Sequence, residues 1–142
     1  MNEQRPKILV VDDDDDFAAA LGAYLGHQGY AVVGASSGRE GVERARAERP
    51  DLVLMDVMME ERTAGFFAIQ ELRRDPLLAD VPVVVVSSIY ADVPGFRITP
   101  EADWLRHDAF LAKPVDFDEL AACVRRLLAE HRAAAVPAAE TP

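Results

Sequence analysis

Three short apolar runs without polar alternation constrain the fold of this chain more than any other feature. They are residues 8–11, 52–55 and 83–86, which read Ile-Leu-Val-Val, Leu-Val-Leu-Met and Val-Val-Val-Val. Strands that are covered on both faces show this continuous apolar pattern, which is typical of parallel sheets. A fourth run, residues 30–33, and a weaker fifth, residues 110–112, complete a set of five predicted strands.

Segments with helical periodicity separate the predicted strands. Asp15 and Asp116 are the expected N-caps of the first and last helices, because an aspartate side chain accepts hydrogen bonds from the free N–H groups of a first helical turn. Strands that alternate with helices predict an α/β sandwich around a parallel sheet. The helical patterns lie in residues 17–25, 38–49, 65–74, 100–107 and 117–128.

The composition is that of an ordinary soluble domain. Half of the 142 residues are apolar and 28% are charged, so the chain is long enough to bury one core. The formal net charge of -10 argues against a generic binder of nucleic acid or anionic membranes, because both need a basic surface. One cysteine permits no disulfide framework, and no apolar run approaches the roughly 20 residues of a membrane span. We therefore expect a cytoplasmic protein with one domain over residues 5–132 and a disordered Ala- and Pro-rich tail over residues 133–142.

Carboxylates directly follow two of the predicted strands. Asp12 and Asp13 begin a run of five aspartates after the first strand, and Asp56 follows the third. A charge run is ordinarily a solvated loop or a helix-capping cluster, but in a doubly wound sheet these two strands are neighbours and ligands bind beyond their ends. Two carboxylates about 4 Å apart repel by roughly 4 kcal/mol at an effective dielectric constant of 20. Because Mg²⁺ is typically held by one or two carboxylates plus phosphate oxygens, the cluster predicts Mg²⁺ together with a phosphoryl group.

Two further strand ends carry polar groups that fit such a site. Ser87 ends the fourth predicted strand and offers a hydroxyl donor, and Lys113 follows the fifth. Lys113 alone would be interpreted as a surface cation. Three acids, one hydroxyl and one ammonium at the ends of four strands indicate a site for a phosphoryl group instead.

Four segments, taken in order, resemble the receiver domain of two-component response regulators. They are residues 7–14, 50–59, 81–88 and 110–120, and their order and approximate spacing agree with that family. The resemblance implies a flavodoxin-like fold, with a doubly wound five-stranded parallel sheet in the order 2-1-3-4-5 and helices on both faces. It also implies a signalling domain that catalyses only its own phosphorylation and dephosphorylation.

The resemblance assigns a phosphoacceptor and a metal site. Asp56 would accept a phosphoryl group from a phosphohistidine on a sensor histidine kinase or a phosphotransfer protein. The Mg²⁺ ligands would be Asp12, Asp13, Asp56 and the backbone carbonyl of Met58.

The remaining roles concern the switch. By resemblance, Ser87 would hydrogen-bond the phosphoryl group and Lys113 would pair with it, with a cis bond between Lys113 and Pro114. Phe110 matches the aromatic switch position, although it is equally well interpreted as a core residue. The face formed by the fourth helix, fifth strand and fifth helix would then meet a downstream protein or form a homodimer, with no direct binding of nucleic acid or membrane.

Two rival functions remain open. An aspartate-nucleophile phosphohydrolase on a similar sheet would need a second acid two residues after the nucleophile; that position is Met58 after Asp56, but it is Asp14 after Asp12. A degenerate receiver would bind partners without phosphorylation. The five aspartates of the first β-α turn, which contains no glycine, argue against a nucleotide- or flavin-binding module.

Overall fold

The computed structural model of the chain describes residues 5–56, 64–87 and 109–135, without the side chains of residues 64–66, 87, 110, 112 and 132–135. Three sequence-based expectations lie outside the described residues: the short helix over residues 100–107, the backbone carbonyl of Met58, and the tail beyond residue 135.

A parallel sheet forms the centre of the molecule. Its strands follow the order β2-β1-β3-β4-β5, and every neighbouring pair runs parallel. Strand β1 is central, because Ile8 pairs with Val32 on one side and with Leu52 on the other. The expected parallel α/β sheet with the order 2-1-3-4 is therefore confirmed. The strands are β1 (Lys7–Val11), β2 (Ala31–Ala35), β3 (Leu52–Met55), β4 (Val83–Ser87) and β5 (Ala109–Ala112).

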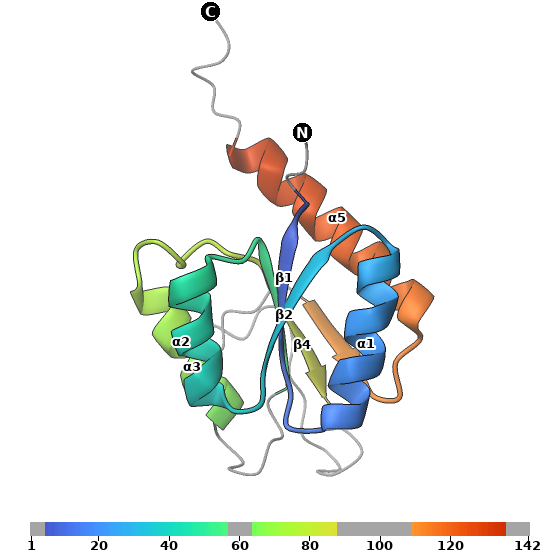
Figure 1. Ribbon diagram of the computed structural model, residues 1–142. Coiled ribbons are helices and arrows are strands. Elements are labelled where there is room, and N and C mark those ends of the chain that lie inside the picture. Colours follow the sequence, from blue (N-terminus) through green and yellow to red (C-terminus); the bar gives the residue numbers. More distant parts are fainter. Residues whose placement is uncertain (1–4, 57–63, 88–108, 136–142) are drawn as a thin grey trace, which may run out of the picture.

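Helices cover both faces of this sheet, as expected (Figure 1). Helices α2 and α3 lie together on one face, and α1 and α5 lie on the other. Buried side chains form one cluster under each pair: Val11 packs with Ile69 of α3 in the first, and Val10 packs with Leu21 and Leu120 in the second. Adjacent residues of β1 thus supply opposite cores, because side chains alternate along a strand. The helices are α1 (Asp15–His27), α2 (Gly38–Glu48), α3 (Ala64–Arg74) and α5 (Phe117–Ala135).

The N-cap of α1 differs from the expected residue, whereas the N-cap of α5 is the expected one. The N-cap of α1 is Asp14, whose side chain accepts a hydrogen bond from the backbone N–H of Phe17 at 3.1 Å, whereas Asp15 is already helical. The prediction of Asp15 was wrong because all five residues of the run can cap a helix, and the end of β1 decides which one does. Asp116 accepts two backbone hydrogen bonds from the first turn of α5, at 2.8 and 3.2 Å, which confirms that cap.

Helix α5 continues to Ala135, beyond the domain end expected at residue 132. Within the described ranges, no helix combines the length and the apolar composition that a membrane span needs.

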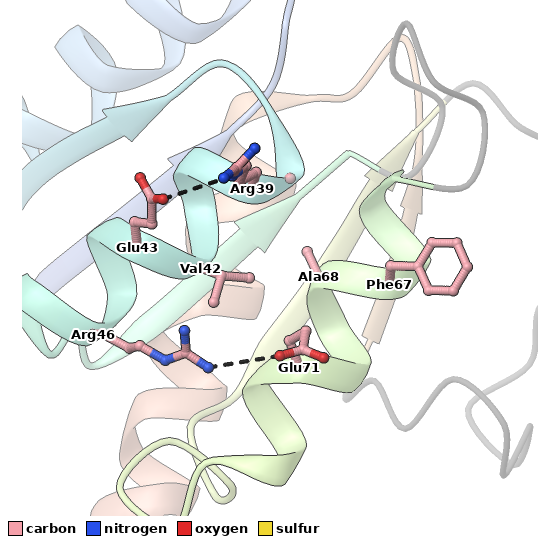
Figure 2. Close-up of a pocket in the computed structure, with 8 residues that line it drawn as sticks. Arg39, Val42, Glu43, Arg46, Phe67, Ala68 and Glu71 are labelled. Atoms are coloured by element: carbon pink, nitrogen blue, oxygen red, sulfur yellow. Dashed lines mark ion pairs between the residues drawn. The ribbon is translucent and has the colours of Figure 1, made fainter.

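A hollow of about 360 Å³ opens between α2 and α3 (Figure 2). Val42 and Ala68 face each other across it, while the exposed ring of Phe67 points away from α2. Arg46 spans the hollow to Glu71, with 3.7 Å between the charged atoms. The hollow therefore belongs to the contact between these two helices.

Candidate functional site

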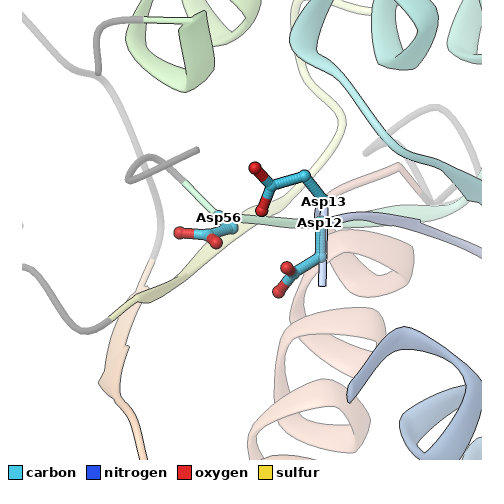
Figure 3. A group of neighbouring side chains, drawn as sticks. All are labelled: Asp12, Asp13 and Asp56. Carbon is cyan, nitrogen blue, oxygen red and sulfur yellow. The ribbon is translucent and has the colours of Figure 1, made fainter. Parts of the chain in front are cut away.

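The two strand-end acids are oriented by the sheet itself. The backbone N–H of Asp12 donates to the carbonyl of Ala35 at 3.0 Å, and that of Asp56 donates to the carbonyl of Val11 at 2.9 Å. Parallel hydrogen bonding thus continues one residue past β1 and β3. Because β1 and β3 are neighbours, both side chains emerge at the same edge of the sheet (Figure 3).

The expected convergence of three carboxylates is present. One oxygen from each of Asp12, Asp13 and Asp56 lies within 4.8 Å of the others. Asp12 and Asp56 are only 2% and 4% exposed, whereas Asp13 is open to solvent. The backbone N–H of Asp14 donates to Oδ1 of Asp12 at 2.8 Å, which fixes that carboxylate from the start of the following turn. Burial of like charges at this spacing is unfavourable without a cation, so the cluster favours a bound positive charge.

Lys113 supplies one such charge. It follows β5, and its Nζ lies 2.8 Å from Oδ2 of Asp12 and 3.5 Å from Oδ2 of Asp56. Burial acts to lower the pKa of Lys113, but the hydrogen bond to Asp12 and the negative charges of Asp56 and Asp12 together raise it above its ordinary value. The lysine is therefore held as an ammonium beside the acids. Its bond to Pro114 is cis, as the family resemblance implied.

An aromatic ring also lies close to this ammonium. Nζ of Lys113 is 4.4 Å from the centroid of the Phe17 ring, within the range of a cation–π interaction. The sequence pattern placed Phe17 only on the apolar face of a helix. No sequence signal could have linked Phe17 to a lysine near the other end of the chain, since periodicity reports which face of a helix is buried and not what covers it.

The other expected site residues are placed only in part. Ser87 is the last residue of β4 and pairs with Ala112, so its backbone lies at the same edge of the sheet as the acids. Phe110 pairs with Val85 in the adjacent strand. The side chains of Ser87 and Phe110 are outside the described atoms, and Met58 is outside the described residues.

The donor set fits a hard divalent cation. All three converging ligands are carboxylates, and oxygen ligands are what Mg²⁺ selects. The three carboxylates outweigh the single ammonium of Lys113, so the described groups leave negative charge for a metal ion to neutralise. A zinc site, in contrast, usually contains histidine or cysteine ligands, and this acidic cluster contains neither.

Comparisons with known proteins agree with this geometry. The family model of the response regulator receiver domain matches residues 8–125. The chain is 35% identical over 126 residues to the DNA-binding dual master transcriptional regulator RpaA of Synechocystis, a match that covers 87% of this chain and 49% of RpaA. It is 34% identical over 123 residues to protein PilH of Pseudomonas aeruginosa, covering 87% of this chain and 98% of PilH. The chain thus spans about half the length of RpaA and nearly all of PilH.

A solved structure shares both the fold and moderate sequence identity. The response regulator protein TrrA from Thermotoga maritima, in complex with Mg(2+)-BeF, superimposes with a TM-score of 0.70 at 26% identity. That match covers 85% of this chain and 97% of TrrA. Since the family model spans most of the chain and the fold is shared, the chain belongs to the response regulator receiver domain family.

Proposed function

We propose that this receiver domain accepts a phosphoryl group on Asp56 from a phosphohistidine of a sensor histidine kinase or a phosphotransfer protein. One observation carries the proposal: the carboxylate of Asp56 lies at a strand end together with two further carboxylates, and the ammonium of Lys113 is 3.5 Å away. A nucleophile, a cation and oxygen ligands for a metal are the parts that phosphoryl transfer needs.

Mg²⁺ is part of this proposal. Asp12, Asp13 and Asp56 would hold it, with the backbone carbonyl of Met58 as a further ligand. Bound there, Mg²⁺ would neutralise negative charge that builds up on the transferring oxygens. The Mg(2+)-BeF complex of TrrA supports this assignment by similarity.

The chain's own residues have distinct roles in the transfer. An oxygen of Asp56 attacks phosphorus in line, the bond between phosphorus and the histidine nitrogen breaks, and an aspartyl phosphate forms on Asp56. Lys113, now beside Asp12 and Asp56, pairs with an oxygen of the phosphoryl group. Hydrolysis of the aspartyl phosphate returns the carboxylate.

The structural response is also a proposal. Ser87 would hydrogen-bond the phosphoryl group and Phe110 would act as the switch aromatic, on a five-stranded domain whose last helix, α5, ends at Ala135. The face that includes β5 and α5 would then contact a downstream protein or a second copy of the chain. The net charge of -10 supports protein partners rather than direct contact of this domain with nucleic acid, and the single cysteine suits the reducing cytoplasm.

The phosphohydrolase alternative finds little support in the geometry. It would use Asp12 as nucleophile and Asp14 as general acid. The carboxylate of Asp14 caps α1, and the backbone N–H of Asp14, not its carboxyl group, contacts Asp12.

The test uses a small phosphodonor. Wild-type protein incubated with acetyl phosphate and Mg²⁺ should gain the mass of one phosphoryl group, and chelation of Mg²⁺ with EDTA should prevent the gain. Asp56→Asn should abolish it, because the amide is not a nucleophile. Asp16→Asn is the matched control, since Asp16 is an exposed aspartate of the same acidic run outside the cluster. Uptake by Asp56→Asn, or none by wild type, would refute the proposal.

A further inference from the structure

We propose that Phe17 is a positioning residue for phosphoryl transfer, because its aromatic face holds the ammonium of Lys113 beside Asp56. This inference deepens the proposed function and rests on it. Phe17 belongs to the first turn of α1 and would act through Lys113, whose Nζ lies over its ring.

Nζ of Lys113 lies close to two carboxylates and to the face of one ring. It lies 2.8 Å from Asp12, 3.5 Å from Asp56 and 4.4 Å from the centroid of the Phe17 ring. The side chain of Lys113 is only 19% exposed, so water competes weakly for the ammonium. A cation over a ring face is attracted by the negative quadrupole of the ring, and this attraction is larger when the cation is desolvated.

The ring is itself held in place. Its neighbour Phe117, at the start of α5, meets it edge to face with centroids 6.1 Å apart and planes at 71°. The ring of Tyr24 packs on Phe117 in turn, with centroids 5.3 Å apart. At the other end, the backbone N–H of Phe17 is bonded to the capping carboxylate of Asp14. A fixed ring can restrict a flexible lysine, whereas a mobile ring could not.

One turn supplies two of the partners of Lys113. Asp12 directly follows β1, Asp14 caps α1, and Phe17 follows in the first helical turn. The backbone N–H of Asp14 fixes Asp12, and the side chain of Asp14 fixes the backbone of Phe17. The carboxylate and the ring face are therefore held relative to each other by contacts that do not involve Lys113.

A spectroscopic test asks whether the contact exists in solution. A proton above an aromatic face is shifted upfield by the ring current, so the ε-CH₂ protons of Lys113 should resonate upfield of ordinary lysine protons. Phe17→Leu keeps an apolar side chain of similar size but has no ring, and should move these signals to ordinary positions. Phe17→Tyr keeps the ring and should retain the shift. Unshifted Lys113 signals in wild type would overturn the proposal.

A kinetic test asks whether the contact matters for transfer. With acetyl phosphate and Mg²⁺, Phe17→Leu should take up the phosphoryl group about two- to five-fold more slowly, the fold-change expected from loss of one cation–π interaction. Phe17→Tyr should restore the wild-type rate, which a purely structural role would not require. Phe67→Leu is the matched control, because Phe67 is an exposed ring on α3 that does not contact Lys113.

The outcomes separate the two proposals. Phosphorylation of Phe17→Leu at the wild-type rate would overturn the positioning role, even if the NMR signals move. No phosphorylation of wild type would refute the proposed function, while the Lys113 signals would still decide whether Phe17 holds the ammonium. Slower transfer and lost upfield shift in Phe17→Leu, both restored by Phe17→Tyr, would support the inference.

Discussion

The two helical layers of this protein pack against the same sheet in different ways. Helix α2 approaches the sheet closely, since Gly41 lies against Val11 of β1. Surface ion pairs connect α2 to α3 and to the turn after it: Arg46 pairs with Glu71 and Asp75 at 3.7 and 3.3 Å. These contacts involve side chains outside the acidic cluster. The layer is therefore expected to govern stability while leaving the site unchanged.

The layer of α1 and α5 is joined by aromatic rings that do reach the site. Phe17 contacts both Phe117 and the ammonium of Lys113. Aromatic pairs of this geometry contribute about 0.5–1.5 kcal/mol beyond their buried area, comparable to or larger than an exposed ion pair. One layer of helices on this sheet thus mainly stabilises the fold, whereas the other also positions a residue of the site.

The largest expected effect comes from an arginine of the α3 layer. Nη1 of Arg73 donates to the carbonyls of Ala79 and Val81 at 2.9 and 2.6 Å, which fastens the turn between α3 and β4. Arg73→Met keeps the aliphatic stem and removes both bonds, so the free energy of unfolding should fall by about 2 kcal/mol, measured by urea denaturation. Uptake of the phosphoryl group by the folded variant should match wild type.

Arg74→Met is the control for this variant. Arg74 is 74% exposed and pairs with Glu71, three residues earlier, so its loss should cost no more than about 0.5 kcal/mol. Equal destabilisation by the two substitutions would contradict the role given to Arg73. Slower phosphorylation of Arg73→Met would contradict the expectation that the layer of α2 and α3 affects stability but not the site.

The next effect concerns a close approach of α2 to the sheet. A Cβ at Gly41 would lie 2.9 Å from a methyl group of Val11, which is fully buried. Overpacking costs about 1–3 kcal/mol, while alanine gains about 1 kcal/mol over glycine in a helix. Gly41→Ala should therefore lower the free energy of unfolding by about 1 kcal/mol.

Gly26 of α1 provides the matched comparison. A Cβ there meets nothing within 4 Å, so Gly26→Ala should gain helix stability without strain, by about 0.5 kcal/mol. Thermal denaturation of the two variants should thus shift the midpoint in opposite directions. Shifts of the same sign would mean that Val11 yields to the added methyl group.

Much of the site could be predicted from the sequence because the topology of a parallel sheet brings residues from separate local patterns together in space. Asp12 and Asp56 each follow an apolar run, and a parallel sheet brings such strand ends to one edge. Lys113 alone would be interpreted as a surface cation, and only together with these acids does it predict a group that binds a phosphoryl oxygen. This prediction needed only the positions of the strands in the sequence and their order in the sheet.

What could not be predicted depends on choices among equivalent residues or on contacts across the chain. Asp14 and Asp15 are identical side chains, and only the path of the backbone after β1 selects the cap of α1. The position of Phe17 under Lys113 requires the packing of α1 against α5, which no periodicity encodes. The need for glycine at position 41 likewise arises from Val11, far away in sequence.

The smallest expected effect is a titration in the α1 and α5 layer. The hydrogen bond to Asp118, helped by burial and by the negative charge of Asp118, raises the pKa of Tyr24 above its ordinary value near 10. In Asp118→Ala the phenol should ionise at lower pH, observed for Tyr24 by NMR or by its absorbance change against a Tyr24→Phe blank. Tyr30 is the internal control, because burial and not Asp118 raises its pKa, so its titration should stay unchanged.

The sign of the linked effect on stability follows from the direction of the shift. A raised pKa means that the folded state holds the Tyr24 proton more tightly than the unfolded state, so the contribution is complete below about pH 10 and is lost as pH rises through the folded value. Tyr24→Phe should remove this alkaline loss and should leave phosphorylation at neutral pH unchanged, because Phe117 still meets Phe17 and a ring at position 24 still packs on Phe117. If Tyr24→Phe slowed phosphorylation, the hydroxyl as well as the ring stack would have to be included in the support of Lys113, and the aromatic layer would reach the site by a second route.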